Sequence, residues 1–294
     1  MKALISGIKR MEIHDGEGIR TTVFFKGCPL KCIWCHNPES ISSEKQLAFF
    51  ADKCISCGSC YKSCTHSAIS FNQYPLINKE LCTNCFVCQK NCPTNALMSY
   101  GDEWELDDLE SCILQDRVFF ETSKGGITLS GGECLRQGEF VTELSKSLYM
   151  KGISVNIDTC GFVNKNLIHT VMPYIDTFLY DIKAIDSNLH KSLTGQDNKL
   201  ILDNLKHLSE SGCNIEIRYL LVKGYNDGEC EKIGEFLQHL NGIKKVQVLR
   251  YHSLAASRYK ALNLKNTLPH TETTDSDMLK AIDALKKFNL NVSQ

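Results

Sequence analysis

Cysteine is the residue type that carries the clearest chemical signal in this chain of 294 residues. There are 16 cysteines, and eleven of them fall into three short groups. Residues 28–35 hold three of them, and residues 54–64 and 82–92 hold four each. Such dense groups with Cys-x-x-Cys spacing indicate metal or redox chemistry more often than disulfides. We expect the five isolated cysteines to pack as small apolar side chains: Cys112, Cys134, Cys160, Cys213 and Cys230.

The two groups of four are copies of one pattern. Each reads C-x2-C-x2-C-x3-C, and the second copy lies 28 residues after the first. Three thiolates with this spacing can ligate one four-iron cluster, while the fourth, a short step further on, ligates the other cluster. The predicted ligands of one [4Fe-4S] cluster are therefore Cys54, Cys57, Cys60 and Cys92, and those of the other are Cys82, Cys85, Cys88 and Cys64.

Residues 48–100, which contain both copies, resemble the bacterial ferredoxin module that binds two [4Fe-4S] clusters. Pro93 follows the last cysteine as in that module, whereas Thr65 stands where the first copy would have proline. Two zinc sites are the alternative, because zinc also binds four cysteines. Zinc sites usually combine two Cys-x-x-Cys pairs, so a triplet plus one cysteine favours iron-sulfur clusters.

The first group is different because no fourth cysteine lies nearby. The β-branched and aromatic run of residues 21–25 predicts a buried strand, and C-x3-C-x2-C follows it at Cys28, Cys32 and Cys35. A [4Fe-4S] cluster held by three thiolates leaves one iron open, as a catalytic zinc ion keeps an open position for substrate. The spacing therefore predicts chemistry at this cluster. A damaged zinc knuckle with His36 as the fourth ligand is the alternative.

The segment GCPLKCIWCHNPES resembles the signature of the radical S-adenosylmethionine (SAM) superfamily, with Trp34 as the aromatic residue before the last cysteine. The flanking DGEGIR and CHNPES are similar to the glycyl radical enzyme activating enzymes, a group typified by the activating enzyme of pyruvate formate-lyase. A ferredoxin-like insert directly after the motif fits the same group. The resemblance implies reductive cleavage of SAM to a 5′-deoxyadenosyl radical, which abstracts hydrogen from a glycine of a partner enzyme.

The rest of the chain predicts an α/β fold. Short apolar runs alternate with amphipathic stretches, which indicates βα units and a parallel sheet. Including residues 21–25, we expect six strands; the other five are residues 126–129, 154–157, 177–182, 215–222 and 245–249. Six strands predict a partial (β/α)6 barrel of the TIM type. Residues 1–47 and 101–294 would form the barrel, and residues 48–100 would form the inserted domain.

Functional residues of such barrels collect at the carboxyl ends of the strands. The resemblance assigns SAM contacts there to Trp34, Gly131, Gly132, Glu133, Asp181, Lys183, Arg218 and His252. It also implies a monovalent cation held by Asp158 and Asp181. The alternatives are purely structural roles. Arg218 and His252 would serve as local hydrogen-bond partners, and Glu133 and Asp158 would cap the helices that follow them.

Composition restricts the partners. The formal net charge is -1 and the chain has no block of lysine or arginine, which disfavours nucleic acid. It has no apolar run of about 18 residues and no apolar stretch near residue 1 that suits a signal peptide, so we expect a cytoplasmic protein without a membrane anchor. The resemblance implies a glycyl radical enzyme as substrate and a flavodoxin or ferredoxin as electron donor, and we expect a monomer.

Two other functions compete with this prediction. Another radical SAM reaction, such as activation of anaerobic ribonucleotide reductase or modification of a small molecule or peptide, would use the same three-cysteine motif. An electron carrier or iron-sulfur sensor would need only the insert. That second hypothesis leaves the segments SGGE, DIK and RYH at successive strand ends without a purpose.

Overall fold

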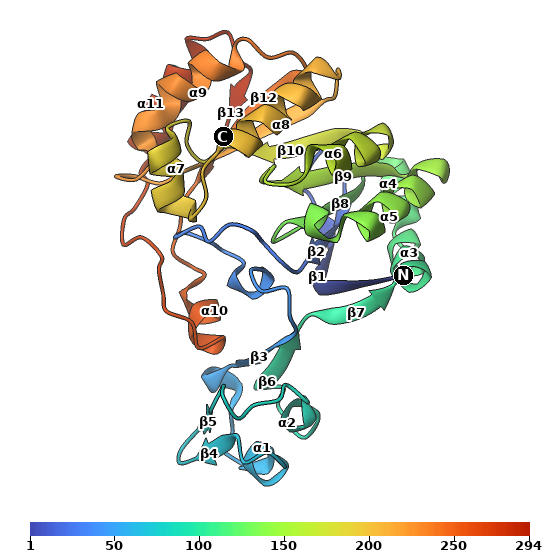
Figure 1. Ribbon diagram of the computed structural model, residues 1–294, viewed down its shortest axis with the longest axis vertical. Coiled ribbons are helices and arrows are strands. Elements are labelled where there is room, and N and C mark those ends of the chain that lie inside the picture. Colours follow the sequence, from blue (N-terminus) through green and yellow to red (C-terminus); the bar gives the residue numbers. More distant parts are fainter.

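The computed structural model describes residues 1–294, and most of them surround one nine-stranded sheet (Figure 1). The strand order is β13-β12-β11-β10-β9-β8-β2-β1-β7. The strands are β1 (Lys2–Glu12), β2 (Arg20–Phe25), β7 (Asp102–Glu105), β8 (Gly126–Gly131), β9 (Ser154–Thr159), β10 (Thr177–Asp181), β11 (Ile215–Leu221), β12 (Ile243–Arg250) and β13 (Val292–Ser293).

All six predicted strands are present. They are β2, β8, β9, β10, β11 and β12, and each is parallel to its neighbours in that order. This confirms a mostly parallel α/β sheet. The prediction lacked β1 and β7, which extend one edge as antiparallel strands, and β13, which extends the other edge beside β12.

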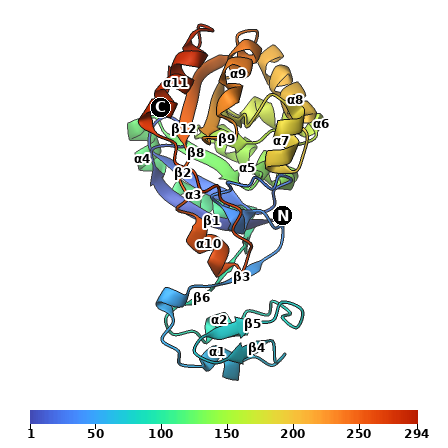
Figure 2. The same cartoon turned by 90° about the vertical axis from the view of Figure 1, so that its left-hand side faces the viewer.

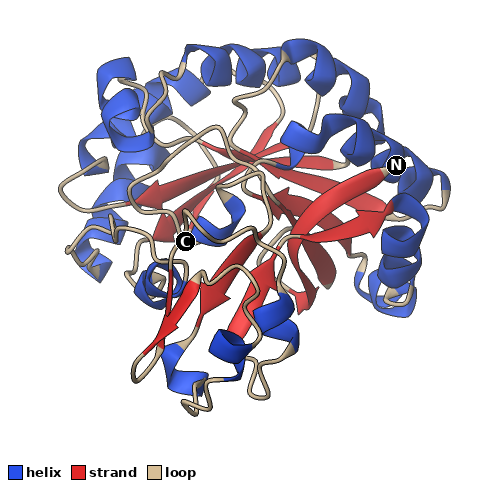
Figure 3. Cartoon of the chain, turned by 60° about the horizontal axis from the view of Figure 1, so that its bottom comes forward, coloured by secondary structure: helices blue, strands red, loops and turns tan.

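Helices make the crossovers that parallel strands require, and they lie on the outer side of the sheet (Figure 3). They are α3 (Leu106–Leu114), α4 (Arg117–Ser123), α5 (Gly138–Met150), α6 (Lys165–Val171), α7 (Ser187–Thr194), α8 (Lys199–Glu210), α9 (Cys230–Leu237) and α11 (Asp275–Lys286). Helix α10 (Ala256–Ala261) lies apart from them, at the end of the body from which the cysteine-rich segment projects (Figure 1). A core of 39 buried residues fills the space between sheet and helices. None of the helices is long and apolar enough to span a membrane.

The cysteine-rich segment forms a separate small unit that projects from one end of the body, as two perpendicular views show (Figures 1 and 2). Its base is an antiparallel pair, β3 (Gln46–Phe49) with β6 (Leu97–Tyr100), and a second pair joins β4 (Ile69–Phe71) to β5 (Pro75–Ile77). Its two short helices are α1 (Ser59–Lys62) and α2 (Val87–Lys90). These helices start at equivalent positions of the two sequence copies, 28 residues apart.

Helix α11 offers a matched test of how burial stabilises the body. Leu285 is fully buried in the main core, whereas Leu279 on the same helix is 61% exposed. We predict that Leu285→Ala lowers the free energy of unfolding by about 2–5 kcal/mol, because it removes buried methyl groups and leaves a cavity. Leu279→Ala should change it by less than about 0.5 kcal/mol. Urea denaturation measures both, and equal effects would contradict this packing.

Candidate active site

A cavity of about 510 Å³ lies where the six parallel strands end. Parallel strands that share a sheet present their carboxyl ends at one edge, so the loops that follow them meet there. The cavity is lined by residues from all six strand ends. The predicted residues among them are Cys28, Cys32, Trp34, Cys35, Gly131, Gly132, Asp158, Asp181, Lys183, Arg218 and His252.

The three-cysteine loop is fixed by contacts with two helices. The backbone N–H groups of Lys31 and Ile33 donate to the carbonyls of Thr194 (2.7 Å) and Leu193 (3.0 Å) at the end of α7. On α10, the Tyr259 hydroxyl donates to the Cys35 carbonyl at 3.0 Å. These contacts fix the backbone of the loop on both sides of Cys32.

Packing around Trp34 adds to this rigidity. Its side chain is buried in a small apolar cluster that also contains Leu193, Tyr251 and Tyr259. Burial raises the pKa of the Cys32 thiol to about 11 and that of Cys35 to about 12. Buried thiols with such high pKa values become thiolates readily only when they bind a metal centre, which fits a cluster ligand set.

Paired charges also line the cavity. The Lys183 ammonium lies 2.9 Å from the Asp181 carboxylate. Burial alone would lower the pKa of Lys183, but Asp181 and Cys32 outweigh it, and the pKa is raised. Lys183 therefore stays charged at neutral pH and can attract a carboxylate of a ligand.

Arg218 forms a second charged group on β11. Its guanidinium pairs with Asp15 at 3.3 Å and Asp158 at 3.4 Å, and it donates to the His14 carbonyl at 2.8 Å. Its Nε is buried and has no hydrogen-bond partner. Buried donors are rarely left unsatisfied, so this N–H fits a site that awaits a ligand.

Asp158 has the most perturbed carboxyl in the cavity. Burial raises its pKa to about 6; Arg218 opposes this shift, and the carboxylates of Asp181 and Asp15 add to it. The Ser130 hydroxyl donates to Asp158 at 2.6 Å. Together with Lys183 and Arg218, these groups suit a ligand that carries both an ammonium and a carboxylate.

Glu133 departs from its expected position. The side chain is fully buried and does not line the cavity. Its carboxylate accepts hydrogen bonds from the Thr159 hydroxyl (2.8 Å) and from the backbone N–H groups of Cys160 (2.9 Å) and Leu135 (3.2 Å). The last contact caps the short 3-10 helix Cys134–Gln137. In the structure Glu133 therefore caps this helix and joins the ends of β8 and β9, and its contact with SAM stays a prediction.

The neighbouring glycines serve close backbone packing. A Cβ on Gly131, whose φ is 120°, would lie 2.2 Å from the Phe25 carbonyl oxygen. A Cβ on Gly132 would lie 2.4 Å from the Ser40 carbonyl oxygen. Both glycines border the cavity, but the structure requires them for the approach of the β8 end to β2 and the loop after it.

Two histidines lie together in the lining of the cavity. The rings of His36 and His252 are stacked with centroids 4.2 Å apart, and His36 Nε2 lies 2.7 Å from the His252 carbonyl oxygen. His252 thus lines the cavity as expected, and His36 contacts it there.

Across the whole chain, no three His, Cys, Asp or Glu side chains converge closely enough to hold a single metal ion.

Asp15 and Cys160 also line the cavity; Asp15 was not among the predicted site residues, and Cys160 was expected only to pack beside the site. Asp15 accepts a hydrogen bond from Thr22 at 2.8 Å and pairs with Arg218, which is 203 residues away in the chain. Asp15 belongs to the segment DGEGIR, but no feature of the neighbouring sequence indicates that Arg218 is its partner. Cys160 follows Thr159 directly, in the strand-end segment DTCG, and it is buried.

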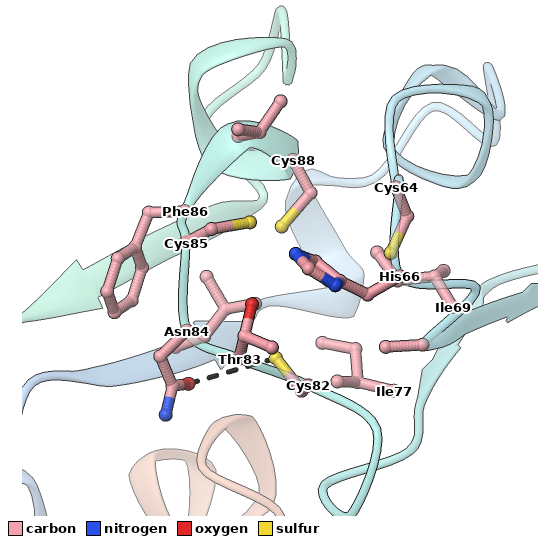
Figure 4. Close-up of a pocket in the computed structure, with 13 residues that line it drawn as sticks. Cys64, His66, Ile69, Ile77, Cys82, Thr83, Asn84, Cys85, Phe86 and Cys88 are labelled. Carbon is pink, nitrogen blue, oxygen red and sulfur yellow. Dashed lines mark hydrogen bonds between the residues drawn. The ribbon is translucent and has the colours of Figure 1, made fainter.

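The eight cysteines of the small unit surround two further cavities. One is lined by Cys54, Cys57, Cys60 and Cys92. The other is lined by Cys64, Cys82, Cys85 and Cys88, and Figure 4 shows these four around one space together with His66. These are the two sets of four that the repeat predicts. Each set combines three cysteines of one copy with the last cysteine of the other.

Comparison with known proteins identifies the family of the chain. Residues 22–237 match the Radical SAM superfamily. A solved domain of pyruvate-formate lyase-activating enzyme from Bacteroides vulgatus superposes with a TM-score of 0.50 at 26% identity, over 57% of this chain and 98% of that domain.

Relatives that match over nearly the full length of the chain identify its subgroup within this superfamily. The trans-4-hydroxy-L-proline dehydratase activating enzyme of Clostridioides difficile is 40% identical over 99% of both chains. The choline trimethylamine-lyase activating enzyme of Oleidesulfovibrio alaskensis is 37% identical over 99% of this chain and 97% of its own. The protein therefore belongs to the radical SAM superfamily and, within it, to the activating enzymes of glycyl radical enzymes.

The charge arrangement of the cavity generates a prediction about Asp158. Arg218→Gln should raise the pKa of Asp158 above about 6, because it removes the nearest positive charge that favours the carboxylate. Ser130→Ala should raise it less, because it removes only a neutral hydrogen bond. A 13C NMR titration of the carboxyl carbons in the metal-free protein measures both. A larger shift with Ser130→Ala would contradict the ion pair.

Proposed function

We propose that this enzyme cleaves SAM reductively and that the resulting 5′-deoxyadenosyl radical abstracts hydrogen from a glycine of a partner glycyl radical enzyme. The observation that carries the proposal is the single cavity that joins three partly buried cysteines to the charged ends of the parallel strands. The full-length relatives, which are activating enzymes of this kind, support it.

Cys28, Cys32 and Cys35 would hold a [4Fe-4S] cluster. When bound, this cluster supplies an electron and one open iron for the amino and carboxylate groups of SAM. Lys183 would attract the SAM carboxylate, while Asp158 and Asp181 would accept hydrogen bonds from its amino group. The unpartnered Nε of Arg218 is a further donor toward SAM. Trp34 and the stacked His252 would border the ligand.

The cation predicted at Asp158 and Asp181 has an internal competitor. Each of these carboxylates already faces a cationic side chain, Arg218 at 3.4 Å and Lys183 at 2.9 Å. Arg218 is shared with Asp15 at 3.3 Å, however, so three carboxylates of the cavity face two cationic side chains. One negative charge is left over, and the monovalent cation at Asp158 and Asp181 therefore stays part of the proposal.

The partner would offer a glycine loop to the cavity. Glycine suits this role because, without Cβ, its backbone can adopt conformations that other residues avoid and can approach the cavity closely. The names of the relatives suggest two candidate partners, trans-4-hydroxy-L-proline dehydratase and choline trimethylamine-lyase. A cytoplasmic location and a monomeric state belong to the proposal as well.

Residues 48–100 would bind two further [4Fe-4S] clusters as a ferredoxin-like domain. The two cavities lined by four cysteines each support this assignment. With all four positions of each cluster occupied by protein, neither has an open iron for substrate. We therefore assign them the transfer of electrons from a flavodoxin or ferredoxin toward the active-site cavity.

Reductive cleavage of SAM is the reaction that tests the proposed function. After anaerobic reconstitution and reduction with dithionite, the protein should convert SAM to methionine and 5′-deoxyadenosine. Cys32→Ala should abolish this product because it removes one of three cluster ligands, whereas Cys112→Ala, at an isolated cysteine of α3, should leave it unchanged. Chromatography with mass detection quantifies 5′-deoxyadenosine.

Incubation with each candidate partner then completes the test. A glycyl radical should appear by electron paramagnetic resonance in the partner that the enzyme activates. Formation of 5′-deoxyadenosine without a glycyl radical in any tested dehydratase or lyase would favour a different radical SAM reaction. Absence of 5′-deoxyadenosine from the fully loaded protein would overturn the proposed function.

A further inference from the structure

Arg258 on helix α10 contacts the segment that directly follows the third cysteine of the motif. Its Nη1 donates to the His36 carbonyl at 3.2 Å and to Asn37 Oδ1 at 3.0 Å. The same nitrogen pairs with Glu39 Oε1 at 2.7 Å. Arg258 also lines the active-site cavity, although no sequence motif assigns it a role. One side chain thus holds three oxygens of residues 36–39.

Two residues near Arg258 hold the part of the loop before this segment. The Tyr259 hydroxyl donates to the Cys35 carbonyl, and the Thr267 hydroxyl donates to the Ile33 carbonyl at 3.0 Å. Arg258 differs from them because its contacts come after Cys35. The backbone is therefore fixed on both sides of this cysteine, and Arg258 supplies the contacts on the far side.

The position of residue 36 also affects the other side of the cavity. The His36 ring stacks on His252, and its Nε2 lies 2.7 Å from the His252 carbonyl oxygen. Cys35 and His252 both line the cavity. A shift of the His36 backbone would therefore move a cysteine of the motif and the histidine stack together.

Helix α10 is a fixed support because its other end is held as well. Lys79 Nζ of the small unit donates to the carbonyls of Leu262 (3.2 Å) and Asn263 (3.0 Å), which directly follow the helix. Ala48 of β3 packs in a buried cluster with Ala261 and Leu262. Arg258 therefore extends from a helix that is anchored on the small unit.

We propose that Arg258 is a positioning residue for SAM cleavage. It holds the backbone after Cys35, so that the third cysteine of the motif and the stack of His36 on His252 keep their places in the cavity. Arg258 acts through these residues, without contact to SAM, and the inference rests on the proposed function. A displacement of about 1 Å at a reacting centre can lower a rate about 100-fold, so even a small slackening of this segment should be measurable.

Helix α10 provides a matched pair of variants. Arg258→Met removes the three contacts, whereas Lys260→Met removes the same charge from an exposed side chain that lines a different cavity. Both are compared with the unaltered enzyme at equal iron and sulfide content. We expect Arg258→Met to lower the rate of 5′-deoxyadenosine formation at saturating SAM about tenfold. It should also change the electron paramagnetic resonance signal of the reduced enzyme with SAM, and Lys260→Met should change neither.

Two further variants separate positioning from a general loss of stability. Arg258→Lys should restore most of the rate and the original signal, because all three contacts come from one nitrogen and an ammonium group also has three donors. Arg258→Met leaves the buried Glu39 without its partner, which is costly in itself. The double variant Arg258→Met with Glu39→Gln removes that cost, and it should keep the tenfold loss because the contacts with His36 and Asn37 are still missing.

Recovery of the rate in the double variant would assign the effect to the unpaired carboxylate and overturn the positioning role. An unchanged signal and rate in Arg258→Met, or an equal loss in Lys260→Met, would overturn it as well. If the unaltered, fully loaded enzyme forms no 5′-deoxyadenosine, the proposed function fails instead.

Discussion

The common direction of six parallel strands is the constraint on which the active site depends. It brings residues that are far apart in the chain to one edge of the sheet, each on its own strand end. The register then sets their order: Asp158 lies beside Leu179, and Asp181 lies beside Arg218. A shift of one residue in either pairing would turn these side chains to the opposite face of the sheet.

The buried charges of the cavity are arranged so that each has an opposite partner. Arg218 lies between Asp15 and Asp158, and Lys183 pairs with Asp181. Unpaired charges at this depth would be costly, and removal of one partner would leave the other uncompensated. Glu133 stabilises the same edge from behind, since its hydrogen bonds join the turn after β8 to the end of β9. The lining of the cavity is therefore charged, and the hydrogen bonds of Glu133 stabilise the strand ends next to it.

The sequence predicts the central strands and the cysteine sets well because both signals are local. Each central strand is a short apolar run followed by a polar residue, and the 28-residue repeat determines which cysteines belong together. The edge strands were not predicted because neither gives a clear apolar run. Most residues of β1 are partly buried or exposed, and β13 has only two residues. The position of Glu133 depends on Thr159 and Cys160, and that of Asp15 on Arg218, so neither follows from neighbouring residues.

The three cysteine sets are not equivalent, and spectroscopy of the reduced protein tests this difference most directly. Two sets hold four cysteines around a cavity, whereas the third holds three beside the charged strand ends. Electron paramagnetic resonance of the reduced, loaded enzyme should show that SAM alters the signal of one cluster and leaves the others unchanged. Cys28→Ala should remove the responsive signal. Signals that do not respond to SAM, or a response that survives Cys28→Ala, would contradict the account.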